Sequence, residues 1–592
     1  MSAHSGSLGS RAGLGQGPGR LRAGGPPAGR LRLAVSPAER RVLRGYGPLA
    51  GLLVAFILMA AFVPSIAREQ DVVSQGSGGA SSVSLPGTAA AAGGGAAGTA
   101  GSAAGAGTTG HSAGTAARPG AVASGAAATT PCPGRTLQVP GDPYSPPCIA
   151  FSGSDGGATS QGVTGSTINV SYRVTSDGTS FQQQLAALGG AQFADTQADI
   201  NRTILGLQDY FNKNFQFYGR KLNIQFFNGH GSITNELLGQ GQQQADADAV
   251  TAGQQMHAFA ELNGVTEPYD DALAQQHVLA FGAPYLSANW MGQRAPYEWS
   301  VATECNDVAT TASEFGTKML GTLSGHTSAA YAGGSLKGQP RKYAIIAPDN
   351  PWYQDCANAA AAYGNAHGTP ITDDVQYQLD LSTLSSQAAS VVSKLANDGI
   401  TTVYCGCDPI FPIYLTSRAH EQGYYPEWVV VGVALTDTDI VGQLFDQSEW
   451  QHGFGVSYAG PTLPKAATLG YAAYKSVRSD EPANEVNLIY EQMYQMAIGI
   501  EMAGPDLTPQ TFQTGMRAYP GSVANASNAE FGTWKFPAGH YSPQVDSTII
   551  YWNPTKTSPY NGKQGAYVVA SPRYQAGQYP TGPPPLPAGF GG

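Results

Sequence analysis

Two hydrophobic periods alternate along the middle of the chain. Apolar runs typical of strands occur at residues 166–174, 220–228, 256–262 and 277–283. Between the first two runs, residues 193–215 place Ile204, Leu207 and Phe211 at helical spacing. This alternation predicts strands and helices in turn, beginning near residue 160.

A second series of the same kind begins with a predicted strand at 341–348. Its clearest unit is a helix that Ser382 can cap and Gly399 can end. A strand at 400–406, a helix at 409–423 and a strand at 427–433 follow. Continuous apolar strands alternating with helices are typical of a parallel sheet covered on both faces.

The two series predict an α/β fold with two Rossmann-like lobes, about 160–305 and about 340–460. Ligands of such sheets bind outside the carboxyl ends of the strands. The motif "CGCDP", residues 405–409, falls at such a strand end. We therefore expect it at a binding cleft.

The N-terminal part differs sharply in composition. Residues 1–48 contain eight arginines and read as a disordered cytoplasmic tail, and residues 49–67 follow as an apolar segment. The positive-inside rule then predicts a single-pass membrane anchor with everything after it outside the cytoplasm. A cleaved signal peptide is the alternative.

Three further segments follow from composition. Residues 68–130, rich in Gly, Ala, Ser and Thr, predict a flexible linker. Residues 131–575 hold the predicted two-lobed domain, whose C-terminal part is shared between the lobes. The Pro- and Gly-rich residues 576–592 predict a disordered tail.

Bulk charge and motifs exclude several functions. The net charge is −10, and the body that follows the basic tail is acidic, which argues against nucleic acid as a partner. The chain lacks the H-E-x-x-H and G-K-[ST] motifs. We therefore expect no catalytic residues, no cofactor and no metal site.

Six cysteines in an extracytoplasmic domain favour disulfides. Cys132 and Cys148 bracket a Pro-rich loop and predict a local pair. A direct link across one residue is unfavourable in an extended strand, so Cys405 and Cys407 are each expected to pair at a distance. Two connectivities remain open for that group: 305–405 with 356–407, or 305–407 with 356–405.

Several of these stretches resemble one known family. "VLAFGAPYLSANWMGQRAPYEWSVAT", "KYAIIAPDNPWYQDCANAAAAYGNAHG" and "VSKLANDGITTVYCGCDPIFPIYLTSRAHEQGYYPEWVVVG" resemble segments of the type I periplasmic binding proteins of the branched-chain amino acid group, the receptors of ABC importers. The resemblance covers about 160–550. It implies two lobes joined by three crossovers, a small-molecule solute between them and an ABC permease as partner.

The resemblance also implies candidate ligand contacts. In the first lobe these are Tyr285 and Ser287, with Thr266 at the preceding strand end. In the second lobe they are Cys407 or Asp408. Where the family usually carries an acid for a ligand ammonium, this chain has Ala434, with Asp437 and Asp439 nearby. This departure argues against an ordinary amino acid as the ligand, because an unpaired buried ammonium is costly.

The stretch "APDNPWYQDC" allows two interpretations. Trp352 or Tyr353 can form a wall of the ligand site by stacking. The same stretch is also typical of a helix N-terminus, with Pro351 at the first position.

Two functions from different classes fit the sequence. The first is a solute-binding protein of an ABC-type importer that captures a small polar ligand by lobe closure. The alternative is a membrane-anchored sensor or scaffold that keeps the fold without transport.

Overall fold

The computed structural model describes residues 128–190, 193–282, 285–523 and 525–592. All of them lie in the second of two compact units, Ala117–Gly592. The basic tail, the apolar segment at 49–67 and nearly all of the linker expected from the sequence lie outside the described residues. Within the described residues, no helix combines the length and apolar character needed to cross a bilayer.

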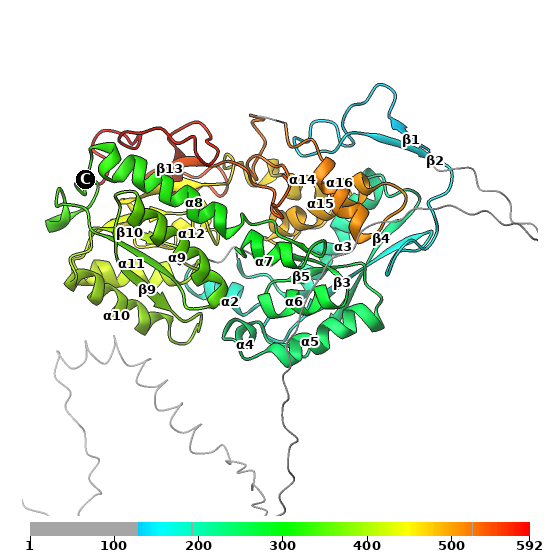
Figure 1. Cartoon of the computed structure of the whole chain (residues 1–592), viewed down its shortest axis with the longest axis horizontal. Helices are drawn as coiled ribbons and strands as arrows, with labels where there is room; N and C mark the ends of the chain where they lie inside the picture. The colour runs from blue at the N-terminus through cyan, green and yellow to red at the C-terminus, as the bar shows by residue number, and fades with distance from the viewer. Residues whose placement is uncertain (1–127, 191–192, 283–284, 524) are drawn as a thin grey trace, which may run out of the picture. The chain divides into compact units, whose positions relative to one another are not determined.

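The first lobe is built on a five-stranded parallel sheet, on the right in Figure 1. In sheet order its strands are β4 (Lys221–Asn228), β3 (Thr167–Val174), β5 (Ala260–Gly264), β6 (Leu279–Gly282) and β7 (Glu298–Trp299). Each of the four strand runs predicted for this lobe overlaps one of these strands, but the run predicted at 256–262 begins four residues before β5.

Helices from two parts of the chain complete the first lobe. The N-terminal group is α3 (Gln197–Asn214), α4 (Ile233–Leu237), α5 (Gln242–Val250), α6 (Glu267–Gln275) and α7 (Ala288–Gln293). The C-terminal group is α14 (Leu469–Lys475), α15 (Val486–Ala503) and α16 (Pro509–Ala518). Ile204, Leu207 and Phe211 of α3 are buried in the same core as Tyr490 and Phe512 of the C-terminal group.

The second lobe contains a seven-stranded mixed sheet. In sheet order its strands are β14 (Gln564–Val569), β13 (Thr548–Thr557), β12 (Gly453–Ser457), β11 (Glu427–Val430), β10 (Thr402–Cys405), β8 (Tyr343–Pro348) and β9 (Ile371–Tyr377). The five strands from β12 to β9 run parallel, and the hairpin β13–β14 adds antiparallel strands at one edge.

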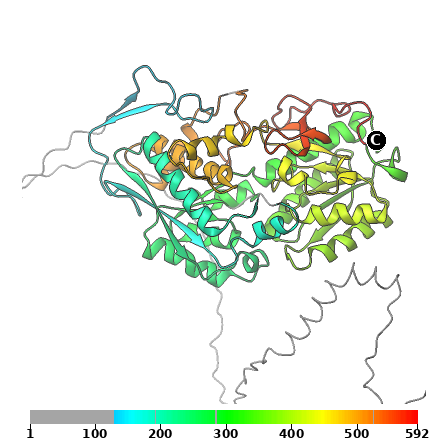
Figure 2. The same ribbon diagram turned by 180° about the vertical axis from the view of Figure 1, so that it is seen from behind.

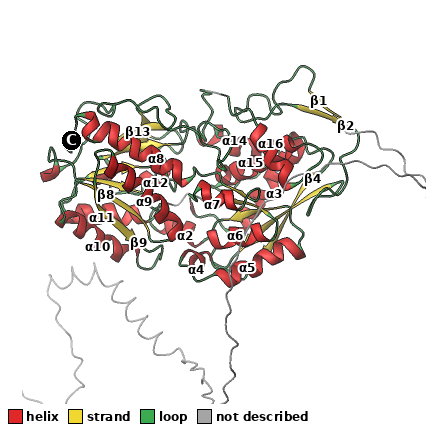
Figure 3. Ribbon diagram, in the orientation of Figure 1, coloured by secondary structure: helices red, strands yellow, loops and turns green. Residues whose placement is uncertain are grey.

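Helices cover both faces of this second sheet, as Figure 3 shows in red around the yellow strands. On one face, α8 (Cys305–Phe315) and α9 (Pro351–Ala366) pack over Ile345 and Tyr404. On the other face, α10 (Leu384–Asn397) and α11 (Phe411–Gln422) pack over Ile346 and Val403. Two short helices, α12 (Asp439–Gly442) and α13 (Gln447–Trp450), follow β11.

The chain passes between the lobes three times after β7: into α8, back from β12 to α14, and again into β13. Figure 2 shows the orange C-terminal helices on the first lobe and the red hairpin on the second. An earlier excursion comes from α2 (Ser180–Ala187), whose Leu185 is buried in the core of the second lobe. Gln184 donates to the Tyr414 hydroxyl of that lobe over 2.9 Å.

Three helix ends show how capping residues act. Thr196 caps α3 through a reciprocal capping box with Asp199. The cap expected from Ser382 is wrong by one residue, because Thr383 holds the N-cap position of α10 and its side chain makes no capping bond. Gly399 follows the end of α10 with φ +65°, as expected for a helix-ending glycine.

Both ends of the described chain have defined structure. A small hairpin, β1 (Ala128–Pro131) and β2 (Ile149–Ser152), opens it. The C-terminal residues 576–592 were expected to be disordered, and the structure corrects this. Tyr579 is buried and Phe590 packs against the second lobe, because aromatic residues within the Pro-rich segment supply apolar surface that composition alone undervalues.

Candidate functional site

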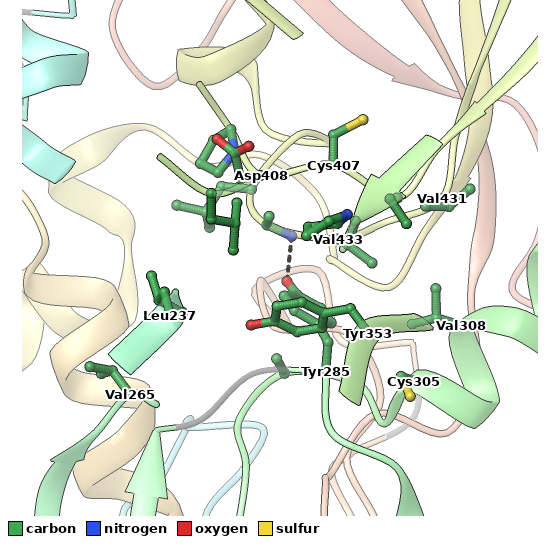
Figure 4. Close-up of a pocket in the computed structure, with 18 of the residues that line it drawn as sticks. Leu237, Val265, Tyr285, Cys305, Val308, Tyr353, Cys407, Asp408, Val431 and Val433 are labelled. Carbon is green, nitrogen blue, oxygen red and sulfur yellow. Dashed lines mark hydrogen bonds between the residues drawn. The ribbon is translucent and has the colours of Figure 1, made fainter. Parts of the chain in front are cut away.

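A cavity of about 490 Å³ lies between the two lobes. Its walls come from the carboxyl ends of β5, β8 and β10, as the rule for parallel sheets predicts, and from α4, α8, α9 and α15. Figure 4 shows Leu237, Val265 and Tyr285 from the first lobe facing Cys407, Asp408 and Val433 from the second. Small-molecule sites have volumes of about 300–1,000 Å³, so the cavity fits a ligand of that class.

The wall from the first lobe is fixed by charged side chains. Asp177 accepts hydrogen bonds from the Ser232 hydroxyl (2.7 Å) and from the Thr234 backbone N–H (2.9 Å), which holds α4 at the cavity. Burial opposes the ionisation of Asp177, but these bonds outweigh it and hold its pKa below the usual value. Glu236 of α4 pairs with the buried Arg173 at 2.8 Å. Leu237 is thereby presented to the cavity.

The wall from the second lobe is the turn after β10. One oxygen of Asp408 accepts from the backbone N–H groups of Ile410 (2.7 Å) and Phe411 (3.1 Å). The other accepts from the Tyr377 hydroxyl at 2.6 Å. Burial raises the pKa of Asp408, although these hydrogen bonds oppose the shift. With both oxygens engaged, Asp408 acts mainly to shape the turn.

Two hydrogen bonds join the lobes across the cavity. The Ala434 backbone N–H donates to the Tyr285 hydroxyl, and the Asn350 side chain donates to the Leu237 carbonyl. Tyr285, Ala434 and Leu435 all have positive φ angles, of 62°, 50° and 60°. Non-glycine residues rarely adopt this conformation, and such residues cluster at ligand sites. Since the Tyr285 hydroxyl accepts here, its own proton can donate to a ligand.

The described lining of the cavity is mostly apolar and includes no cationic side chain. Its described lining contains no Lys, Arg or His, and its ionisable acids are Asp177, Asp408 and Glu485. Burial raises the pKa of Glu485 to about 7. A ligand carboxylate would therefore meet no side-chain cation and would lose hydration on entry.

Comparisons with known proteins agree with this architecture. A family model described as periplasmic binding protein matches residues 208–554. The chain belongs to the periplasmic binding protein family. The type I, branched-chain amino acid-binding resemblance drawn from the sequence is confirmed, and so is the α/β fold with parallel sheets.

Solved structures with similar folds show low identity to this periplasmic binding protein. A fatty acid ABC transporter substrate-binding protein from Thermomonospora curvata is 13% identical, with 73% of this chain and 99% of that chain covered and a TM-score of 0.48. A solute-binding protein from Rhodopseudomonas palustris in complex with 3,4-dihydroxybenzoic acid is 12% identical, with coverage of 69% and 98% and a TM-score of 0.47. A branched-chain amino acid transporter substrate-binding protein from Streptococcus pneumoniae, in complex with isoleucine, is 14% identical, with coverage of 69% and 100% and a TM-score of 0.44. No curated protein sequence matches the chain.

The cleft of this periplasmic binding protein gathers four of the seven predicted contact residues. Tyr285, Tyr353, Cys407 and Asp408 line the cavity. Their contact with a ligand stays a prediction.

The other three predicted contact residues have structural roles outside the lining. Ser287 caps α7 by accepting from the Trp290 N–H at 3.1 Å. Thr266 is buried and donates its hydroxyl to Glu236. Trp352 packs against the core of the first lobe.

The cysteine pairing corrects the sequence-based expectation in part. Cys132–Cys148 is confirmed. The remaining bonds are Cys305–Cys356 and Cys405–Cys407, so both predicted connectivities are wrong. The argument against the second bond assumed an extended strand, but β10 ends at Cys405 and the chain turns, which brings the two Cα atoms to 5.1 Å.

Sequence reasoning missed several cavity residues. Neither Asp437 nor Asp439 lines the cavity: Asp437 accepts from Ser457 at 2.5 Å, and Asp439 accepts from the Tyr567 N–H at 2.8 Å. Other positions were not anticipated, namely Leu237, Val308, Ala309, Ala357, Glu485 and Gln492. The alanine run of α9, "NAAAAYG", was the one visible signal, because small side chains leave space between a helix and its sheet.

One cluster among the described residues has the composition of a metal site: Glu304, Asp307 and His540. His540 Nδ1 lies 3.0 Å from Glu304 and 3.4 Å from Asp307. Hydrogen bonds to Asp307 and Glu304 raise the pKa of His540 to about 10. With His540 as an imidazolium, the cluster is an ion pair between His540 and the two carboxylates. It lies where the chain crosses between the lobes.

Proposed function

We propose that this protein is the extracytoplasmic receptor of an ABC-type importer and that its solute is mainly apolar and carries no negative charge. The observation that carries the proposal is the interlobe cavity, whose lining, among the described residues, is mostly apolar and lacks a cationic side chain. The proposed apolar solute differs from the small polar ligand expected from the sequence. Apolar walls favour an apolar ligand because binding removes apolar surface from water.

The charged and polar groups of the cavity support a ligand without negative charge. The three acids of the lining disfavour an anion, and the Tyr285 hydroxyl can supply a hydrogen bond to a neutral acceptor. A zwitterionic amino acid would need partners for both of its charges. Its carboxylate would find no cationic side chain among the described residues of the lining, only hydroxyl and amide groups.

Family membership and chemistry support the location and the partner. Periplasmic binding proteins capture solutes outside the cytoplasm, and all six cysteines form disulfides, which persist in oxidising compartments. The permease is the partner that a receptor of this family requires. Membrane attachment through residues 49–67 remains part of the proposal.

A thermal-shift comparison tests the ligand class on the full chain. Three compounds of matched carbon skeleton, an n-alkan-1-ol, an n-alkanoate and an n-alkylammonium ion, are compared with leucine. Because a ligand that binds only the folded state raises the melting temperature by mass action, we expect the alcohol to give a larger shift than the alkanoate or leucine. A larger shift with leucine or the alkanoate would overturn the proposal.

Measuring solute uptake by cells distinguishes a transport receptor from a sensor or scaffold. We expect cells that lack this receptor to lose high-affinity uptake of the best-binding solute. Unchanged uptake, with binding to the purified protein intact, would favour the non-transport sensor or scaffold.

A further inference from the structure

The interlobe cavity continues into the interior of the second lobe. Its lining includes Pro348, at the carboxyl end of β8 beside the cleft, and also Ile371. Ile371 pairs with Tyr343 at the opposite end of β8. Because a strand rises about 3.3 Å per residue, the five-residue difference places the far end about 16 Å inside the lobe. We call this part, between α8–α9 and the sheet, the inner chamber.

The inner chamber exists because small side chains face the sheet. Ala309 and Ala312 of α8 line it, as do Ala357 and Ala360 of α9. Each pair is spaced by three residues, so its members lie on one face of their helix. Larger side chains at these positions would fill the gap that helices leave over a sheet. The opposite wall includes Ile345 and Ala347.

The inner chamber offers few polar contacts. Ser313 donates to the Ala360 carbonyl at 3.3 Å, and Thr369 donates to the Gly364 carbonyl at 3.4 Å. Tyr404 supplies a further hydroxyl, for which the described residues provide no hydrogen-bond partner. None of the described residues that line the inner chamber is charged. Water needs two to four polar partners to be held, so this wall suits hydrocarbon better than water.

The mouth of the inner chamber is covalently fixed. The Cys305–Cys356 disulfide joins the start of α8 to α9 at this point. Figure 4 shows Cys305, Val308 and Tyr353 there, with Val431 and Val433 of the second lobe nearby. A slot held open between two tied helices and a sheet is suited to a slender group rather than a bulky ring system. Because protein interiors are otherwise close-packed, a ligand group that fills this gap would explain it.

We propose that the inner chamber binds an unbranched hydrocarbon chain of the ligand, with the polar head group in the interlobe cleft beside Tyr285. The proposal rests on the proposed function and narrows it to linear amphiphiles with an uncharged head. The depth of the inner chamber then sets the longest chain that binds with full affinity.

A chain-length series tests this on the full protein. Dissociation constants are measured by calorimetry for n-alkan-1-ols from butanol to dodecanol. We expect affinity to rise about fourfold per added methylene, the gain for burying one, until the chain fills the inner chamber, and then to level off. Ala360→Leu, which narrows the inner chamber, should move this plateau to shorter chains. The same substitution at Ala359, which is exposed on α9, is the matched control.

A second variant keeps the test informative if the first variant misfolds. Ile371→Ala enlarges the far end of the inner chamber, so we expect the plateau to move to longer chains. If wild type binds alcohols but Ala360→Leu and Ile371→Ala leave the plateau length unchanged, the inner chamber is not the chain site and the proposed function stands. If wild type binds no alcohol, the proposed function itself fails.

Discussion

The Tyr285 hydroxyl of the first lobe accepts a hydrogen bond from the Ala434 backbone N–H of the second. Both residues have left-handed backbone conformations and both line the interlobe cavity. The bond therefore couples lobe closure to the geometry of the site. Ala434 lies where proteins of the resembled family usually carry an acidic residue that binds a ligand ammonium.

Removing this bond should favour the open form. Tyr285→Phe keeps the ring but leaves the Ala434 N–H without its acceptor, and a net hydrogen bond contributes about 0.5–1.5 kcal/mol. We expect the ratio of closed to open protein to fall about two- to tenfold, with a larger radius of gyration for the free protein in small-angle X-ray scattering. Tyr471→Phe is the control, because the Tyr471 hydroxyl contacts the exposed Glu481. An unchanged radius in Tyr285→Phe would show that this bond does not limit opening.

The two disulfides at the cleft should differ in their effect on stability. Cys305–Cys356 spans 51 residues and Cys405–Cys407 spans two. In the chain-entropy model the longer loop restricts the unfolded chain more, by roughly 2–3 kcal/mol. We therefore expect Cys305→Ala/Cys356→Ala to lower the free energy of unfolding more than Cys405→Ala/Cys407→Ala, as measured by denaturant titration. Equal losses would indicate that the short bond stabilises the folded turn directly.

The ion pair of His540 makes stability depend on pH. Because contacts with Asp307 and Glu304 raise the pKa of His540 from 6.5 to about 10, the folded state holds this proton more tightly than the unfolded state. The stabilisation is therefore complete below about pH 6.5 and is lost as pH rises towards 10.

His540→Gln should remove this pH-dependent component. We expect the difference in melting temperature between wild type and His540→Gln to be largest near pH 6 and to shrink by pH 10. Arg517 donates to the His540 carbonyl and interacts with Glu304, so it contributes the same charge to wild type and to the variant. His326→Gln, at an exposed position, is the control. A difference that stays constant with pH would assign His540 a packing role only.

The sequence alone determined much of the secondary structure and the class of fold. Strands such as 341–348 and helices such as 193–215 follow from local periodicity, which a single segment carries by itself. Placement of "CGCDP" at the cleft also followed, because parallel strands end at one edge of their sheet. The local disulfide Cys132–Cys148 was also predicted from the sequence alone.

Only the tertiary structure decided the contacts between distant segments. Ser287 and Thr266 look like ligand donors in the sequence, but their hydroxyls bind Trp290 and Glu236 once the chain is folded. The Cys405–Cys407 bond depended on where β10 ends, and the inner chamber depended on which faces of α8 and α9 meet the sheet. Periodicity shows that a helix has an apolar face, but the volume left beneath that face depends on how closely the helix packs against its sheet. That distance is set by side chains from many parts of the chain at once.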